Sequence, residues 1–226
     1  MPLADPPVGA GSLADLPARP LAGTPLFRVW RRRLPDGSAR ASAWWFASRP
    51  EEAEAGGRFD LLAPDGTCYL ATSLVGAVLE ALQAHLRNLP RAELDVRAAV
   101  EVEPPDEAPD AADLTHPSTA GRGVTAGVWT GTDRARTQRW ASALRRDGWW
   151  ALHTGVHHDP SGTLRAVALF DHAGEHPPSH PGTWRTAHRE LSAPEVLERL
   201  AAFGVHVRGV ANLPVVRPEV RRDPDL

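Results

Sequence analysis

The chain has 226 residues, of which 42% are hydrophobic and 23% are charged, and its formal net charge is −3. This composition is typical of a soluble globular protein with one buried core, and the lack of a basic excess argues against nucleic-acid binding. Residues 1–23 carry acids where a signal peptide needs basic residues, and no apolar run approaches the roughly 20 residues of a membrane span. Cys68 is the only cysteine. We therefore expect a cytoplasmic protein without a disulfide or a membrane contact.

The N-terminal quarter of the chain predicts a lead segment followed by two strands. Residues 1–24 alternate proline, glycine and alanine without a helical or strand period, so we expect an extended or disordered lead. Aromatic and β-branched residues predict strands at 25–30 and 43–47. A Pro-Asp-Gly turn at 35–37 separates them, and an acidic loop that ends in glycine follows at 51–57.

A hairpin and a helix are predicted next. Two short apolar runs, 58–62 and 67–71, flank a second Pro-Asp-Gly turn, which is typical of a β-hairpin. Thr72 or Ser73 is a suitable N-cap for the following helix, which ends before Pro90. Its apolar stripe consists of Leu74, Val78, Ala81, Leu82 and Leu86.

The middle of the chain is less regular. Residues 101–121 are acidic and rich in proline, which predicts a loop or a mobile excursion that acts either as a lid or as a partner-binding stretch. A short amphipathic helix is expected at 137–146, and strands are expected at 149–152 and 165–170. Residues 172–182 form a loop rich in histidine and proline.

The C-terminal part predicts a helix and a final strand. The helix start lies at residues 192–195, where Ser192 is the cap, Pro194 is close to the first helical position and Glu195 is at the third. The helix runs to Phe203 and stops at Gly204. A strand is expected at 205–210. The whole pattern predicts one α+β domain at 25–213 with a polar tail at 214–226.

Four polar residues among these elements are candidates for chemistry. Arg28 and Arg58 lie on or beside apolar strands, where a charge is costly unless it is paired. Tyr69 is the only tyrosine, and Glu80 lies at the margin of the helix's apolar face. The alternative is structural: an Arg28–Glu80 ion pair, a surface Arg58 and a core Tyr69. All 25 basic residues are arginines, which excludes a lysine Schiff base or a P-loop lysine.

Several motifs in order resemble the RES domain family, over roughly residues 25–175. They are LFRV at 26–29, WWF at 44–46, GRFDL at 57–61, GTCYLA at 66–71 and the glutamate at 80, with weaker matches in 137–170. The resemblance implies an ADP-ribosyltransferase-like α+β fold, in which small, mainly antiparallel sheets flanked by short helices form a cleft. The family includes toxins of toxin–antitoxin pairs, so it also implies NAD⁺ cleavage and an antitoxin partner.

The resemblance also implies roles for individual residues. Glu80, Arg28 and Tyr69 would be catalytic, and Arg28, Arg58, Tyr69 and Trp45 would bind NAD⁺, which is the substrate, so no separate cofactor is expected. Cleavage of the nicotinamide–ribose bond builds positive charge on the ribose, which a carboxylate stabilises. Guanidinium groups bind a diphosphate bidentately, and tyrosine offers a flat face for nicotinamide. Aromatic core is the more common role for the WWF motif.

The serine of the family has no clear counterpart. It is expected near 147–160, but residues 149–157 contain no serine. Thr154 supplies a hydroxyl there and is a further candidate for NAD⁺ binding, while Ser161 lies just beyond the matched segment. Three activities therefore remain open: cleavage of NAD⁺ by water or phosphate, ADP-ribosyl transfer to a protein, and silent binding of a nucleotide or an antitoxin.

Six clustered histidines of the second half are candidate metal ligands. They are His153, His157 and His158, followed by His172, His176 and His180. His153 and His157 would share one face only on a helix, and a nearby glycine and proline argue against a helix there. We therefore expect solvated histidines and no metal site.

Overall fold

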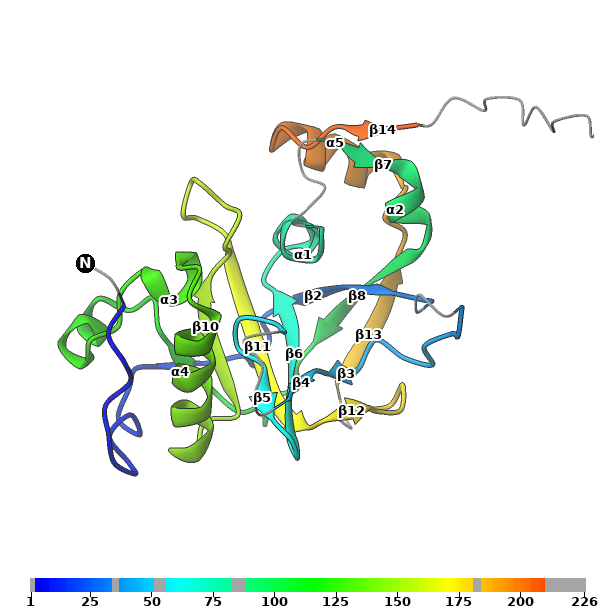
Figure 1. Ribbon diagram of the computed structural model, residues 1–226. Helices are drawn as coiled ribbons and strands as arrows, with labels where there is room; N and C mark the ends of the chain where they lie inside the picture. Colours follow the sequence, from blue (N-terminus) through cyan, green and yellow to red (C-terminus); the bar gives the residue numbers. More distant parts are fainter. Residues whose placement is uncertain (1–2, 34–36, 51–55, 83–87, 181–183, 210–226) are drawn as a thin grey trace, which may run out of the picture.

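A computed structural model describes residues 3–33, 37–50, 56–82, 88–180 and 184–209. It has the predicted α+β architecture, built on an eight-stranded sheet (Figure 1). In spatial order the strands are β1 (Ala18–Arg19), β9 (Ala111–Asp113), β10 (Ala151–Gly155), β11 (Arg165–His172), β6 (Asp65–Ala71), β2 (Leu26–Arg31), β8 (Arg97–Glu103) and β13 (Arg185–Arg189). Neighbouring strands are antiparallel except for β9 and β10. One large sheet joins both halves of the molecule, and three two-stranded sheets accompany it.

Three short ribbons and six helical segments complete the described part. The ribbons pair β12 (Gly174–Glu175) with β3 (Trp45–Phe46), β14 (Val207–Arg208) with β7 (Leu89–Pro90), and β4 (Ser48–Arg49) with β5 (Leu61–Leu62). The helices are α1 (Leu74–Ala81), α2 (Arg91–Asp95), the 3-10 helix η2 (Pro117–Arg122), α3 (Gly127–Thr130), α4 (Arg134–Arg146) and α5 (Pro194–Ala202). No helix among the described residues has the length and apolar character needed to cross a membrane.

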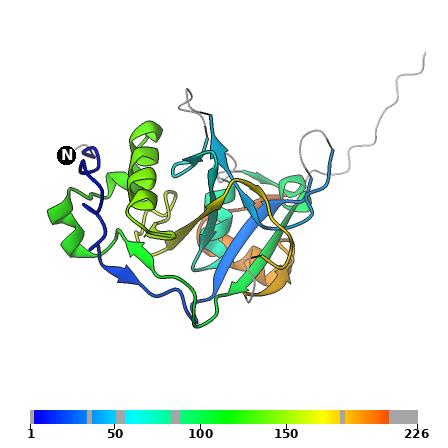
Figure 2. The ribbon, with the colours of Figure 1, turned by 90° about the horizontal axis from the view of Figure 1, so that it is seen from below.

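The sheet opens between β2 and β6. These strands share a single pair of partner residues, Phe27 and Ala71, whereas β2 pairs with β8 over all six of its residues and β6 pairs with β11 over all seven. Helix α4 packs beside β10 and β5, and α1 packs against β2 and α5 (Figures 1 and 2). The two halves therefore carry separate helical layers, with the divergence of β2 and β6 between them.

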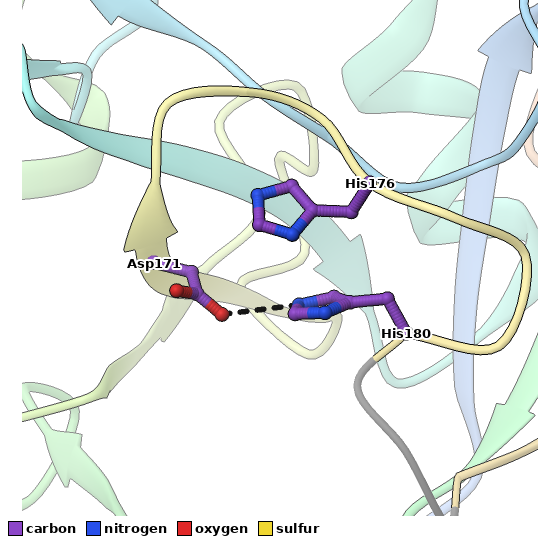
Figure 3. Close-up of side chains that lie close together, drawn as sticks. All are labelled: Asp171, His176 and His180. Atoms are coloured by element: carbon purple, nitrogen blue, oxygen red, sulfur yellow. Dashed lines mark ion pairs between the residues drawn. The ribbon is translucent and has the colours of Figure 1, made fainter.

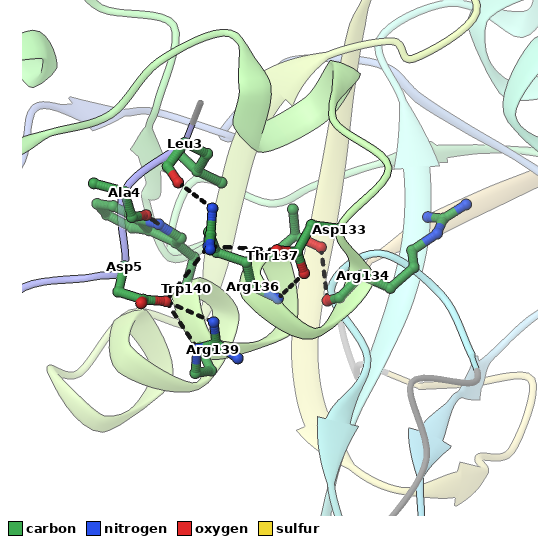
Figure 4. Close-up of polar contacts among 9 residues, drawn as sticks. All are labelled: Leu3, Ala4, Asp5, Asp133, Arg134, Arg136, Thr137, Arg139 and Trp140. Atoms are coloured by element: carbon green, nitrogen blue, oxygen red, sulfur yellow. Dashed lines mark hydrogen bonds and ion pairs between the residues drawn. The ribbon is translucent and has the colours of Figure 1, made fainter. Parts of the chain in front are cut away.

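The N-terminal lead, expected to be extended or disordered, is packed against α4 over the described residues 3–24. Leucines 3, 13, 16 and 21 are buried in the core. Arg136 donates to the Leu3 carbonyl (2.6 Å), Trp140 Nε1 donates to the Ala4 carbonyl (2.9 Å), and Arg139 binds Asp5 (2.6 Å) (Figure 4). The segment has little regular structure, so its stability comes from these contacts, which periodicity does not reveal.

Several elements differ from the prediction in their bounds or in the strands with which they pair. The expected hairpin is wrong, because β5 pairs with β4 and β6 pairs with β11. Residues 101–121 are not all loop: they include the end of β8, all of β9 and the 3-10 helix. The alternating side chains of β8, with Val100 and Val102 buried, are typical of a strand. The expected turn at 35–37, the loop at 51–57, the end of the first helix and the tail at 214–226 lie wholly or partly outside the described residues.

Ser73 is the N-cap of α1, and its Oγ accepts a hydrogen bond from the Gly76 amide (3.1 Å). This confirms the predicted start of the helix. Helix α4 begins at Arg134, three residues earlier than expected, because the Asp133 carboxylate caps it by accepting from the Arg136 amide (2.9 Å).

Replacement of Leu13 by alanine tests the packing of the lead. Leu13 is fully buried, so Leu13→Ala should lower the free energy of unfolding by about 2–5 kcal/mol, as measured by urea denaturation. Val8→Ala is the control, because Val8 is fully exposed, and should change it by less than about 0.5 kcal/mol. Equal stabilities of the two variants would contradict the packing described here.

Candidate active site

A cleft of about 440 Å³ opens where β2 and β6 separate. It is lined by β2, the inner side of α1, the 56–59 loop, α3, the first residue of α4 and the end of β10. Five of the six predicted site residues line it: Arg28, Arg58, Tyr69, Glu80 and Thr154. They come from five separate elements, and the volume lies in the range of ordinary ligand pockets.

Glu80 lies in the last turn of α1 and presents its carboxylate to the cleft. Its Oε1 accepts a hydrogen bond from the His157 backbone amide (2.6 Å). That bond spans the cleft, from α1 to the loop after β10, and fixes the direction of the carboxylate. Ala77 and Ala81 line the cleft beside it, so small side chains leave room for a ligand next to Glu80.

Arg58 lies across the cleft from Glu80 and is only 7% exposed. Its guanidinium donates to the Gly131 carbonyl and contacts His157 Nδ1 (3.0 Å). The same Nδ1 lies 2.8 Å from the Trp129 carbonyl, so it either accepts from Arg58 or donates to Trp129. Burial lowers the pKa of Arg58 to about 10 and the nearby Arg134 cation adds to this, while Glu80 opposes it. Arg58 remains charged at neutral pH.

The loop that carries Arg58 is held from both sides. Thr137 Oγ1 donates to the Arg58 carbonyl (2.6 Å), and Gln138 Nε2 donates to the Gly57 carbonyl (2.9 Å). Both of these residues lie on α4. Gly57 has no room for a side chain, because a Cβ there would lie 2.5 Å from the Tyr69 hydroxyl oxygen. The glycine of the GRF motif is therefore required for the close packing of loop and strand.

Tyr69 has its hydroxyl group fully engaged. The hydroxyl donates to Asp60 Oδ1 (2.7 Å) and accepts from the Phe59 amide (2.9 Å). Burial raises the pKa of Tyr69 well above its ordinary value, and the neighbouring Asp60 carboxylate raises it further. Burial also raises the pKa of Asp60, although its hydrogen bonds from Tyr69 and Gly57 act in the opposite direction. Tyr69 thus stays protonated and offers the cleft its ring, not an acid or a base.

Arg28 lies deep in the cleft, 8% exposed, and is held without a carboxylate. Its guanidinium contacts Cys68 Sγ and donates to the Trp45 carbonyl (3.0 Å). Trp45 does not line the cleft, so its expected direct contact with NAD⁺ is not supported. Its ring instead lies beneath the Arg40 guanidinium, 5.0 Å from the ring centroid. The neighbouring Trp44 and Phe46 are core residues.

The cleft is strongly cationic although the whole chain is acidic. Six arginines line it, at positions 28, 31, 40, 58, 97 and 134, together with one carboxylate, that of Glu80. Arg31 and Arg97 form ion pairs with Glu93. For the other four, no carboxylate of the described residues lies within ion-pair distance. The structural ion pair between Arg28 and Glu80 is therefore not formed, and positive charge remains available to an anion.

Arg134 is the main cleft residue that sequence reasoning missed. It is the first residue of α4, and its side chain extends away from the contacts of the N-terminal lead (Figure 4). A cation is unfavourable at a helix N-terminus, where the backbone already carries partial positive charge. That unfavourable placement, next to the Asp133 cap, is the one signal in the sequence that singles out Arg134.

The histidines behave differently from the expectation. His153 is buried, and its Nδ1 lies 3.0 Å from Asp113 Oδ1, so the expectation that it is solvated was wrong. His157 lies in the cleft, and its ring contacts that of His158, with centroids 4.5 Å apart. Within the described ranges, one group can hold a metal ion, and it lies outside the cleft at Asp171, His176 and His180.

The RES domain family model matches residues 25–192. The sequence has no significant match among curated proteins. Among solved structures, the chain is similar to one in the crystal structure of the M. tuberculosis MbcT–MbcA toxin–antitoxin complex, with 15% identity and a TM-score of 0.48, over 79% of this chain and 88% of that one. The family match covers well over half of the sequence and includes all five predicted residues that line the cleft. The chain belongs to the RES domain family.

Proposed function

We propose that the protein cleaves NAD⁺ at the nicotinamide–ribose bond, as a glycohydrolase or a phosphorylase. The observation that carries the proposal is the arrangement of the cleft, where four guanidinium groups without a carboxylate partner among the described residues line the same cavity as Glu80. Family membership supports the same activity, because the RES family is one of NAD⁺-consuming proteins.

The arginines suit the diphosphate of the dinucleotide. A diphosphate carries two negative charges, and guanidinium groups bind phosphate oxygens bidentately. Arg134 lies close enough to Arg58 for its positive charge to lower the pKa of Arg58. An anion placed between them would relieve this repulsion. Two further cations, Arg28 and Arg40, line the same cleft and are available to a phosphate acceptor or to the second phosphate.

The Glu80 carboxylate is suited to stabilise the charge that develops when the nicotinamide–ribose bond breaks. The electron pair of the ribose C1′–nitrogen bond leaves with nicotinamide, which becomes neutral, and the ribose develops oxocarbenium character. The Glu80 carboxylate, fixed by the His157 amide, stabilises this charge and binds the ribose hydroxyls. The oxygen of water or phosphate then bonds to C1′, and an attacking water releases its proton to solvent. Thr154 also lines the cleft, and we assign its hydroxyl the role of the family's serine.

The family also includes toxins controlled by antitoxins, and we extend the proposal to such a pair. NAD⁺ loss would then be the toxic event. Expression of the wild-type chain in a bacterial host should deplete cellular NAD⁺, whereas expression of a chain with an inactive cleft should not.

Glu80→Gln tests the central role. The substitution removes the negative charge but keeps the shape, so nicotinamide release should slow by about 10²–10³, measured by chromatography of NAD⁺ incubations. Glu198→Gln is the matched control, because Glu198 is exposed on α5, and should keep the wild-type rate. A Glu80→Gln variant as active as the control would overturn the assignment.

The same incubations identify the acceptor. Free ADP-ribose that forms without phosphate indicates hydrolysis, and an ADP-ribose phosphate ester that forms only with phosphate indicates phosphorolysis. A labelled protein band from tagged NAD⁺ would instead indicate protein ADP-ribosylation. Binding of NAD⁺ without nicotinamide release would indicate the silent module and contradict the proposal.

Arg134→Ala tests the diphosphate site. A charged hydrogen bond contributes about 1.5–3 kcal/mol, so the KM for NAD⁺ should rise by about tenfold to a hundredfold. The matched control is Arg199→Ala on α5, because Arg199 is exposed. Unchanged KM values in both variants would show that Arg134 does not contact the substrate.

Substitutions at Tyr69 separate its ring from its hydroxyl. Tyr69→Phe keeps the ring in the cleft but removes the donor to Oδ1 of buried Asp60, so the free energy of unfolding should fall by about 1–3 kcal/mol with most of kcat retained. Tyr69→Ala removes the ring and should lower kcat/KM much further. If the phenylalanine variant lost activity as completely as the alanine variant, the hydroxyl would be the reacting group.

A further inference from the structure

A second cluster of polar side chains lies outside the cleft. Asp171 is the penultimate residue of β11, and His176 and His180 lie on the loop that follows β12. Their potential ligand atoms all lie within 4.8 Å of one another. The Asp171 Oδ2 atom is 3.0 Å from His180 Nε2, and the two imidazole rings have centroids 4.1 Å apart (Figure 3).

The hydrogen bond of His176 sets its tautomer. Its Nε2 lies 2.8 Å from the His172 carbonyl, which only accepts hydrogen bonds, so Nε2 carries the proton. The lone pair is then on Nδ1, available to a ligand. A ring N–H bound to a backbone carbonyl is the arrangement that orients metal-ligating histidines.

The ring of His180 has a buried nitrogen that its surroundings do not satisfy. Its Nε2 is buried and makes no hydrogen bond of good geometry with any described residue, although the Asp171 carboxylate is near. Two imidazoles and one carboxylate are a donor set that a divalent cation binds.

We propose that Asp171, His176 and His180 bind a zinc ion, with water as the fourth ligand. Imidazole nitrogens and a carboxylate oxygen are common zinc ligands, and three residues between two histidines is a usual spacing. Ligands at about 2.1 Å from a tetrahedral ion lie about 3.4 Å apart. The Asp171–His180 pair is already near this separation at 3.0 Å, and no two ligand atoms lie more than 4.8 Å apart, so small side-chain shifts admit the ion.

The site braces one wall of the cleft. Ser42 Oγ donates to the His176 carbonyl (2.6 Å), and the His176 amide donates to the Trp44 carbonyl (2.8 Å). The next carbonyl along the chain, that of Trp45, holds Arg28. None of the three ligands lines the cleft, so the ion is structural, fixing the 172–180 loop against the segment that positions Arg28.

Calorimetric titration with ZnCl₂ tests the site. Protein without a polyhistidine tag is treated with a chelator, desalted and titrated, and the wild type should bind one equivalent. His180→Ala and Asp171→Asn should each weaken binding by about a hundredfold or more. His172→Ala is the matched control, because its imidazole is exposed and only its backbone carbonyl is used, and should bind zinc as the wild type does.

Thermal unfolding gives a second, independent readout. Zinc should raise the Tm of the wild type and of His172→Ala, and leave that of His180→Ala unchanged. If His180→Ala does not fold, His176→Ala serves in its place. No uptake by the wild type, or equal uptake by the ligand variants and the control, would overturn the proposal. Neither experiment involves NAD⁺, so its outcome is independent of the proposed enzymatic activity.

Discussion

Strands β2 and β6 share one pair of partner residues and then separate, and the candidate site depends on this separation. Beyond Phe27 and Ala71, each strand continues its pairing on the outer side only, with β8 and β11 respectively. The inner backbone edges face a cavity in place of a neighbouring strand. Side chains that would be packed within a continuous sheet, those of Arg28 and Tyr69, line a cleft instead.

The cleft concentrates positive charge at a cost to stability. Burial of a guanidinium without a carboxylate is unfavourable. Among the described residues, Arg28 is nevertheless held by a thiol and a backbone carbonyl, and Arg58 by a carbonyl and an imidazole. Carboxylate partners would neutralise these cations. Neutral partners fix their positions and leave the charge for an anionic substrate. An acidic chain thereby maintains a cationic site.

Much of the site could be predicted from the sequence, because Arg28, Arg58, Tyr69 and Glu80 lie within short motifs next to recognisable strands and a capped helix. Arg134 was missed, because the amphipathic pattern of α4 begins only at Thr137, although the Asp133 cap sets the true start. The contact of Trp45 with Arg28 could not be predicted, since it is made by a backbone carbonyl and not by a side chain.

The pairing of strands was the least predictable part of the fold. A local turn signal favours a hairpin between β5 and β6, but β6 instead pairs with β11, for example Thr67 with Phe170. Such long-range pairing depends on which faces must be buried, which a local pattern does not encode. The lead segment was misjudged for the same reason, because its buried leucines follow no helical or strand period.

The most direct test of the account is a crystal structure of Glu80→Gln bound to NAD⁺. The account predicts that the diphosphate lies within hydrogen-bonding distance of Arg58 and Arg134, with the nicotinamide ribose beside position 80 and the nicotinamide against Tyr69. NAD⁺ bound elsewhere, or with its adenine end at position 80, would contradict it.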